Sequence, residues 1–405
     1  MISRRARSVQ ASPIRKLFPY ADSARKRGIH VYHLNIGQPD IETPHFFWDA
    51  VHSYEKRVLA YGPSGGTEDL RAAVADYLCE SGAEATPGQV WITTGGSEAI
   101  IFTIMALCDQ GDEILIPEPF YTNYNGFAAM AGAAVVPLTT EVKSGFRPPG
   151  RDEILSKVTP RTRAIIICSP NNPTGTVYTR GELQAIAEAA LEYRLCVVAD
   201  EVYREFVFDG KKHTSIFEIE DLGDRAIIVD SISKRFSACG ARIGYVVSRN
   251  DEFMESVLRF GQARLCPPTL EQVGIAACFR NMRSFMAGMI GEYERRRDVV
   301  YEKLRRLEGS VYQKPEGAFY VVARLPVDSS EEFARWMLED FNVDGKTTMV
   351  APAGGFYATP GKGVDEVRIA YVLNERDLEE AMEILLRGVE EYNRGRFERQ
   401  AGSGK

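Results

Sequence analysis

A serine, a lysine and an arginine in one short stretch of the chain have a spacing that suits chemistry better than packing. The stretch SISKRFSACGARIG covers residues 231–244 and holds Ser231, Lys234 and Arg242. Their spacing follows neither the period of a helix face nor the alternation of a strand. Because the chain has 49 Lys and Arg residues, Lys234 alone is most simply a solvated lysine, and its surroundings must decide.

Gly95, Gly96 and Ser97 follow the apolar run VWIT and open a helical pattern. Backbone N–H groups at a helix N-terminus attract a phosphate, and glycines let the anion approach the backbone closely. The alternative is that Ser97 only caps the helix. The motif therefore predicts either an anion site or an ordinary helix start.

Two further segments place an aromatic ring and an amide directly after apolar runs. Tyr121 follows EILIPEP, and it either stacks on a flat ligand or packs in the core. Asn172 in PNNPTG follows AIIIC, and it either donates into a cleft or belongs to a Pro/Asn turn.

The run CVVAD ends on Asp200 and is followed by Glu201 and Tyr203. A carboxylate at the end of a buried strand needs a charged or strongly donating partner, because burial otherwise neutralises it. That partner is either a ligand or a basic residue of another element. Glu201 is expected to reach solvent, and Tyr203 to face the same cleft as Asp200.

The apolar runs before these residues predict the strands that position them. Six runs are rich in Val and Ile: 90–93, 113–117, 164–168, 196–200, 226–230 and 243–247. Strands buried on both faces read this way, and helical patterns such as 97–108 and 180–194 alternate with them. We expect a mostly parallel sheet with helices on both faces, with the ligand-binding loops gathered at one edge.

The pattern changes near residue 284, where one long charged helix is predicted to reach residue 309. The strands and helices that follow indicate a small α+β domain. We expect a large domain at 46–285 and a small domain made of 1–45 and 286–405, unless the N-terminal segment joins a neighbouring chain.

One small molecule would use all of these groups together. Arg242 and the helix start can hold a phosphate, since a guanidinium offers two parallel donors. Lys234 can form a Schiff base with an aldehyde, and Asp200 can keep a ring nitrogen protonated so that the ring accepts electrons. The sequence therefore predicts pyridoxal 5′-phosphate as the cofactor.

The stretch 231–244 also resembles the lysine signature of class I/II aminotransferases, the fold-type I family of pyridoxal-phosphate enzymes. The resemblance extends from LNIGQPD at 34–40 to EVRIAYV at 366–372, and it is greatest for the aspartate aminotransferase-like branch. It implies an α/β fold with a mostly parallel, seven-stranded sheet in the large domain and a small α+β domain. The matching positions in the stretch are Ser231, Ser233, Lys234, Ser237, Gly240, Arg242 and Gly244.

The resemblance also implies roles for single residues. Lys234 forms the Schiff base and moves the proton, and Asp200 pairs with the ring nitrogen. Tyr203 and Asn172 contact the phenolic oxygen of the ring, on which Tyr121 stacks. The residues implied to hold the phosphate are Gly95, Gly96, Ser97, Ser231 and Arg242.

Two further implications concern the substrate and the oligomer. Arg368 is expected to bind the α-carboxylate of the substrate, assisted by Asn172 and the backbone of Gly37. Tyr61, in YGPSGGTEDLR, is expected to reach the phosphate of the neighbouring subunit's cofactor. The resemblance therefore implies a homodimer with shared active sites.

The implied activity is ping-pong transfer of the α-amino group of an amino acid, expected to be aspartate or glutamate, to a 2-oxo acid such as 2-oxoglutarate. Candidate cations for the distal carboxylate are Arg15, Lys16 and Arg264. Each also has a structural explanation, a solvated helix for the first two and an interface salt bridge for the third. The alternatives are a lyase or synthase on the same fold, or an aminotransferase for aromatic or small neutral amino acids.

Two interpretations of a different kind compete with this one. SISK fits S-x-x-K and GPSGG at 62–66 fits G-x-S-x-G, as in serine hydrolases, but the second motif needs a preceding strand and 46–61 reads as helix. A transcription regulator on the same fold needs an added DNA-binding domain, and only about thirty residues precede LNIGQPD. The net charge of −7 also disfavours nucleic-acid binding.

The composition argues against several other classes. No apolar run is long enough to span a bilayer, and the basic N-terminus leads into no apolar signal core, so a cytoplasmic protein is expected. The seven cysteines never stand in C-x-x-C spacing, which predicts reduced, mostly buried thiols. Five histidines are too few for most zinc sites, so no metal is expected.

Overall fold

The structure is a computed structural model that describes residues 1–10 and 12–402. Its largest sheet has seven strands in the order β2-β8-β7-β6-β5-β3-β4. All neighbours are parallel except that β8 runs antiparallel to β2 and β7. The strands are β2 (Val90–Thr93), β3 (Glu113–Glu118), β4 (Ala134–Thr139), β5 (Thr162–Cys168), β6 (Cys196–Asp200), β7 (Ala226–Ser231) and β8 (Gly244–Ser248).

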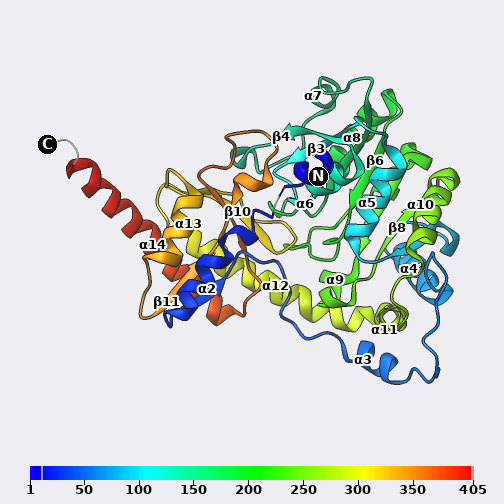
Figure 1. The fold of residues 1–405 in the computed structure, drawn as a ribbon, viewed down its shortest axis with the longest axis horizontal. Helices are drawn as coiled ribbons and strands as arrows, with labels where there is room; N and C mark the ends of the chain where they lie inside the picture. Colours follow the sequence, from blue (N-terminus) through cyan, green and yellow to red (C-terminus); the bar gives the residue numbers. More distant parts are fainter. Residues whose placement is uncertain (11, 403–405) are drawn as a thin grey trace.

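Helices cover both faces of this sheet (Figure 1). Successive residues of a strand point to opposite faces, so Val197 joins the core under one layer of helices and Val198 the core under the other. This double burial explains why the predicted runs are continuously apolar. One layer contains α4 (Glu68–Glu80), α8 (Arg180–Glu192) and α11 (Thr269–Arg280), and the other α5 (Gly96–Leu107), α6 (Asn123–Ala131) and α10 (Asp251–Arg264).

β4 is the strand of this sheet that the six apolar runs do not include. It lies at the sheet edge beside β3, most of its side chains are partly exposed, and it contains Pro137. An edge strand tolerates proline because one side of its backbone needs no ladder partner. Its weaker apolar character therefore follows from its position.

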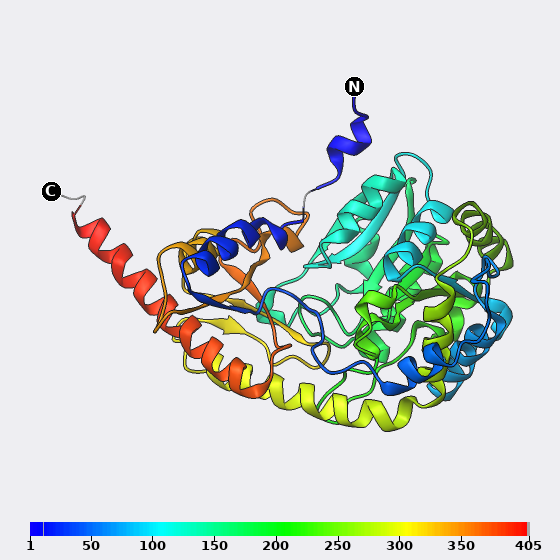
Figure 2. The ribbon, with the colours of Figure 1, turned by 60° about the horizontal axis from the view of Figure 1, so that its bottom comes forward.

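A second group of elements lies beside the large sheet (Figure 2). It contains an antiparallel sheet in the order β12-β13-β10-β9 and a parallel pair, β1 and β11. The long helix α12 runs along both regions, and Phe285 near its start contacts both cores. The elements are β1 (His30–His33), β9 (Val311–Tyr312), β10 (Tyr320–Arg324), β11 (Lys346–Met349), β12 (Ala351–Pro352), β13 (Glu366–Ala370), α2 (Phe18–Lys26), α12 (Met282–Leu304), α13 (Ser330–Glu339) and α14 (Glu375–Gly402).

The prediction of a helix over 46–61 is wrong for the second half of this range. The helix α3 (His45–His52) ends early, and the chain that follows has only turns and bends before α4. Val58, Leu59 and Tyr61 in this segment are 72%, 60% and 81% exposed. Most helices in proteins are stabilised by packing an apolar face, and this segment has no such support within the single chain.

The first helix, α1 (Arg4–Ser8), contacts α6 on the large sheet, whereas α2 and β1 join the second core. The remaining α-helices of the described residues are the short helices α7 (Arg151–Leu155) and α9 (Ile232–Arg235). We propose the division into 46–285 and 1–45 with 286–405 on the separation of the hydrophobic cores, with α1 as an exception.

Candidate active site

The predicted residues gather in a cleft of about 620 Å³ between the large sheet and the second group of elements. The antiparallel β8 begins at this edge, where Gly244 lies opposite Thr93 of β2 and Ser231 of β7. Arg242, just before β8, therefore reaches the loops that follow the parallel strands. The predicted residues that line the cleft are Gly37, Gly96, Ser97, Tyr121, Asn172, Asp200, Tyr203, Ser231, Lys234, Arg242 and Arg368.

A cradle for an anion forms where α5 begins. Gly95 has a φ of 78°, and a Cβ there would lie 2.5 Å from Nη2 of Arg242. A Cβ on Gly244 would lie 2.5 Å from the carbonyl carbon of Gly95. Glycine at both positions lets the guanidinium and the helix N-terminus approach one point, a suitable site for a phosphate. Gly95 itself is not among the residues that line the cleft.

Lys234 enters the cleft from α9, directly after β7. Its Nζ donates to the carbonyl of Gly37 at 2.7 Å and lies 3.8 Å from Sγ of Cys239. Burial is the main cause that lowers the pKa of Lys234. A lowered pKa raises the fraction of neutral amine, which is the form that attacks an aldehyde.

Asp200 is a buried carboxyl group whose protein partners are uncharged. The hydroxyl of Tyr124 donates to Oδ2 at 2.7 Å, and the N–H of Val202 donates to Oδ1 at 3.3 Å. No basic side chain of the described residues lies within ion-pair distance, and burial raises the pKa of Asp200 to about 7. The salt bridge that the sequence left open is therefore absent from this region. A cationic ring nitrogen would supply the missing charge, so the site fits pyridoxal 5′-phosphate.

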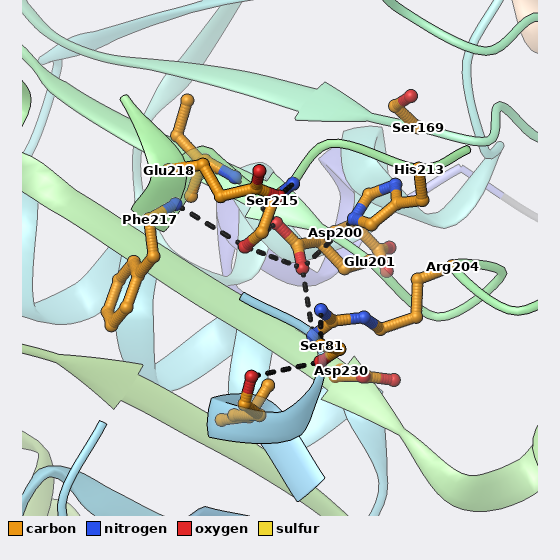
Figure 3. A network of polar contacts seen from close by, with 12 residues as sticks. Ser81, Ser169, Asp200, Glu201, Arg204, His213, Ser215, Phe217, Glu218 and Asp230 are labelled. Atoms are coloured by element: carbon orange, nitrogen blue, oxygen red, sulfur yellow. Dashed lines mark hydrogen bonds and ion pairs between the residues drawn. The ribbon is translucent and has the colours of Figure 1, made fainter. Parts of the chain in front are cut away.

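Glu201, expected to reach solvent, is 1% exposed, so that expectation is wrong. Figure 3 shows its carboxylate surrounded by side chains from the segment that follows it. Arg204 Nη1 lies 3.2 Å away, His213 Nε2 3.3 Å and Ser215 Oγ 2.8 Å. Although burial alone would raise it, Arg204 and His213 hold the pKa of Glu201 at about 2. The chain after β6 folds back onto this carboxylate, which thereby holds the loop that carries Tyr203.

Arg368 enters the cleft from β13. Its Nη1 donates to Oδ1 of Asn172 at 3.1 Å, and its Nη2 donates to the carbonyl of Asn35 at 2.6 Å. The guanidinium carbon lies 4.6 Å from the ring centroid of Tyr320 and 4.9 Å from that of Phe356. No carboxylate of the residues the structure covers pairs with it, and its Nε has no hydrogen-bond partner. The guanidinium of Arg368 is therefore available to bind a carboxylate.

Tyr124 and Tyr320 are two residues of the site that were not predicted from the sequence. Tyr124 contacts Asp200 and follows Tyr121 by three residues, so the spacing YTNY was an available signal. The hydroxyl of Tyr320 lies 2.9 Å from the hydroxyl of Tyr203. The ring of Tyr320 also fills the space that a side chain in place of Gly37 would occupy. It gave no signal because it reads as an ordinary residue of a buried strand.

The three candidate cations for a second carboxylate occupy different places. Lys16 pairs with Glu331 at the surface, and Nε of Arg264 lies 3.1 Å from Oε1 of Glu98. Arg15 lines the cleft, and no ion pair to its guanidinium occurs in the described part of the chain. Arg15 is therefore the candidate that the fold leaves available.

Tyr61, unlike most of the predicted site residues, does not line the cleft of its own chain. It lies in the irregular segment between α3 and α4 and is 81% exposed. Any contact between Tyr61 and a cofactor phosphate therefore needs a second subunit.

All seven cysteines are unpaired, as predicted, but fewer are buried than expected. Cys108, Cys168 and Cys278 are buried, whereas Cys79 is exposed and the others are partly exposed. Among the residues whose side chains the structure describes, no group of three potential metal ligands occurs. In the same residues, no helix combines the length and the apolar character needed to cross a membrane.

The lysine, the anion cradle and the unpaired arginine agree with a comparison to known proteins. Residues 29–385 match the family described as Aminotransferase class I and II. The chain belongs to this family. The aminotransferase is 36% identical to an aromatic-amino-acid aminotransferase of Thermococcus litoralis over 94% of this chain and 96% of the relative. It is 35% identical to an aspartate aminotransferase of Pyrococcus abyssi, over 93% and 95% of the two chains.

A solved structure of an alanine aminotransferase from Pyrococcus furiosus superposes on the aminotransferase with a TM-score of 0.89. The two chains are 30% identical, and the match covers 96% of this chain and all of the other. The fold-type I architecture expected from the resemblance is therefore confirmed. The aminotransferase is a transferase of nitrogenous groups, and the hydrolase and regulator interpretations are wrong.

Proposed function

We propose that this aminotransferase binds pyridoxal 5′-phosphate in the cleft, with Lys234 joined to its aldehyde and Asp200 paired with its ring nitrogen. The observation that carries the proposal is the buried Asp200, whose partners are uncharged and whose pKa is about 7. When bound, the protonated ring accepts the electron pair released at the α-carbon of the substrate. The proposal is tested by adding the cofactor to the purified protein and by reduction with borohydride, which should trap the cofactor on Lys234.

The remaining predicted residues orient the cofactor. Tyr121 would stack on the ring, and Asn172 and Tyr203 would donate to its phenolic oxygen. The backbone of Gly95 and Gly96 and the side chains of Ser97, Ser231 and Arg242 would hold the phosphate.

Lys234 and Arg368 act on the substrate. Arg368 binds the α-carboxylate through a bidentate pair, with Asn172 and the backbone of Gly37 beside it. Lys234 would remove the proton from the α-carbon of the substrate as a base and return it as an acid. Two half-reactions then move the amino group from an amino acid to a 2-oxo acid.

The amino acid that the cleft favours is aspartate or glutamate, with 2-oxoglutarate as the acceptor. Arg368 takes one carboxylate, and Arg15 is a second cation in the same cleft. Relatives named for aspartate and for aromatic amino acids make a preference for aromatic substrates the main alternative.

Arg15→Ala should weaken the use of aspartate and glutamate while leaving alanine little changed. We expect a loss of about 1 kcal/mol of transition-state stabilisation, which lowers kcat/KM about fivefold, because Arg15 is exposed and exposed charge pairs contribute little. Steady-state kinetics with aspartate, glutamate and alanine measure this loss. Lys16→Ala is the matched control, since Lys16 pairs with Glu331 outside the cleft. A wild-type preference for phenylalanine, tyrosine or alanine over both acidic amino acids would contradict the assignment.

We further propose a homodimer with shared active sites, in which Tyr61 reaches the partner's cofactor phosphate. The exposed apolar residues Val58, Leu59 and Tyr61 support it, because they form a surface that a second copy can cover. A cytoplasmic location is supported by the seven unpaired cysteines.

A heterodimer of one Tyr61→Phe chain and one Lys234→Ala chain should regain one complete site. If Tyr61 crosses the interface, both changes fall on the same site and the other site is intact. Cofactor titration of the mixed dimer should then show one site of wild-type affinity with covalent attachment. If Tyr61 serves its own chain, neither site is intact, and the mixed dimer should show only weakened sites.

A further inference from the structure

Arg235, the residue after Lys234, has a side chain that is 0% exposed. It lies on the four-residue helix α9, at the edge of the large sheet where the cleft opens. A guanidinium is removed from water only at a high cost unless charged and hydrogen-bonding groups surround it. Its partners therefore indicate what it holds in place.

Two carboxylates from separate elements flank the guanidinium. Nη2 of Arg235 donates to Oδ2 of Asp230 on β7 at 2.8 Å, and its Nε lies 3.0 Å from Oε1 of Glu205 in the loop after β6. Tyr245 donates to Asp230, and Tyr77 donates to Glu205. The side chain thus joins α9 to β7 and to the loop after β6.

Aromatic rings close the remaining sides of the group. The guanidinium carbon lies 4.8 Å from the ring centroid of Tyr77 and 5.6 Å from that of Phe279. A planar cation against two rings has little freedom to rotate. Because consecutive helical residues point about 100° apart, Arg235 enters the body of the protein while Lys234 faces the cleft.

Asp230, the partner of Arg235, also lies close to the carboxylate on the neighbouring strand. Asp200 lies opposite Val229 in the ladder between β6 and β7, so Asp230 is one residue beyond it. Burial is the main cause that raises the pKa of Asp200, and the negative charge of Asp230 adds to it.

We propose that Arg235 is a positioning residue that fixes α9 so that the amine of Lys234 meets the cofactor aldehyde. This inference rests on the proposed function. Lys234 performs the chemistry, and Arg235 acts on it only through the short helix and the two carboxylates that anchor it.

The test separates covalent capture of the cofactor from its non-covalent binding. Arg235→Lys keeps a cation beside Asp230 but lacks the fork that bridges to Glu205. We expect the limiting rate at which cofactor-free protein captures saturating pyridoxal 5′-phosphate on Lys234 to fall about 10–100-fold, as for a small misplacement of a reacting group. Binding of pyridoxine 5′-phosphate, which has no aldehyde, should stay within about twofold because the phosphate cradle is intact.

Arg297→Lys is the matched control. Arg297 has a 1% exposed side chain and pairs with Asp209 and Asp298, but it lies on α12 and not on α9. Thermal unfolding should show that both variants lose stability, while only Arg235→Lys slows capture. Equal slowing in both variants would mean that general loss of stability is the cause and would overturn the proposal.

Each other outcome is also decisive. If wild-type protein captures no cofactor on Lys234, the proposed function fails. If wild type and Arg235→Lys capture at the same rate, or if capture and pyridoxine 5′-phosphate binding fall together, the positioning role fails. If Arg235→Lys does not fold, the double variant Arg235→Met with Glu205→Met takes its place. Replacing Glu205 as well removes one of the two carboxylates that would otherwise lose their cation. Slow capture of the cofactor by this double variant supports the same role.

Discussion

Lys234→Ala is expected to abolish amino transfer while the protein stays folded. The variant loses both the amine that holds the cofactor and the group that moves the α-proton, so a loss of at least about four orders of magnitude in kcat is expected. The side chain is half-buried and makes one hydrogen bond, to Gly37, besides a long contact with Cys239. Its removal therefore disturbs little of the core. Single-turnover assays with aspartate measure the loss, and circular dichroism checks the fold.

The covalent site is checked by reduction with borohydride followed by peptide mapping. Wild-type protein should carry the reduced cofactor on Lys234, and Lys234→Ala should carry none. Lys211→Ala is a suitable control, because Lys211 pairs with Glu316 at the surface. A label on another lysine would show that the catalytic lysine has been assigned wrongly.

Asp200→Ala is expected to cost about 3–5 kcal/mol of transition-state stabilisation, the typical cost of removing one partner of a buried ion pair. This corresponds to roughly two to four orders of magnitude in kcat/KM. The reason is that the ring nitrogen loses the carboxylate that keeps it protonated. Tyr124→Phe, which removes only the 2.7 Å hydrogen bond to Asp200, should cost much less. Near-normal activity of Asp200→Ala would show that Asp200 does not contact the ring.

The raised pKa of Asp200 also leads us to expect that the stability of the cofactor-free protein depends on pH. Its pKa is raised from 3.8 to about 7 in the folded state, so the protonated form is favoured there. The stability that this proton contributes is fully present below the unfolded pKa and is lost as the pH rises through the folded value. Relative to Asp200→Asn, wild type should thus lose free energy of unfolding between about pH 4 and pH 7.

Urea unfolding of the two proteins at about pH 5 and about pH 8 tests this dependence. Comparing wild type with Asp200→Asn cancels the contributions of other titrating groups, such as Glu205, whose pKa is raised by burial. Bound pyridoxal 5′-phosphate should reduce the difference, since its ring nitrogen supplies a positive charge. An equal slope in both proteins would show that Asp200 is ionised in the empty cleft.

The local sequence was sufficient to predict the large sheet and the edge at which the site lies. Continuous Val/Ile runs such as 164–168 and 196–200 require burial on both faces, and that pattern survives in any fold with two covering helix layers. Polar residues at the ends of such runs meet at one edge because the strands are parallel. Lys234, Asp200 and Asn172 therefore meet in space although long segments separate them in the sequence.

Only the tertiary structure decided which charges have partners. Glu201 reads as a solvent-exposed neighbour of Asp200, yet the returning loop buries it against Arg204 and His213. Arg235 reads as an ordinary basic residue, and its two carboxylate partners come from other elements. Arg15 and Lys16 are adjacent in sequence, but only Arg15 faces the cleft. Pattern reasoning covers neighbours along one helix or strand, whereas these ion pairs depend on how irregular loops turn and on contacts between separate elements, which exist only after the chain has folded.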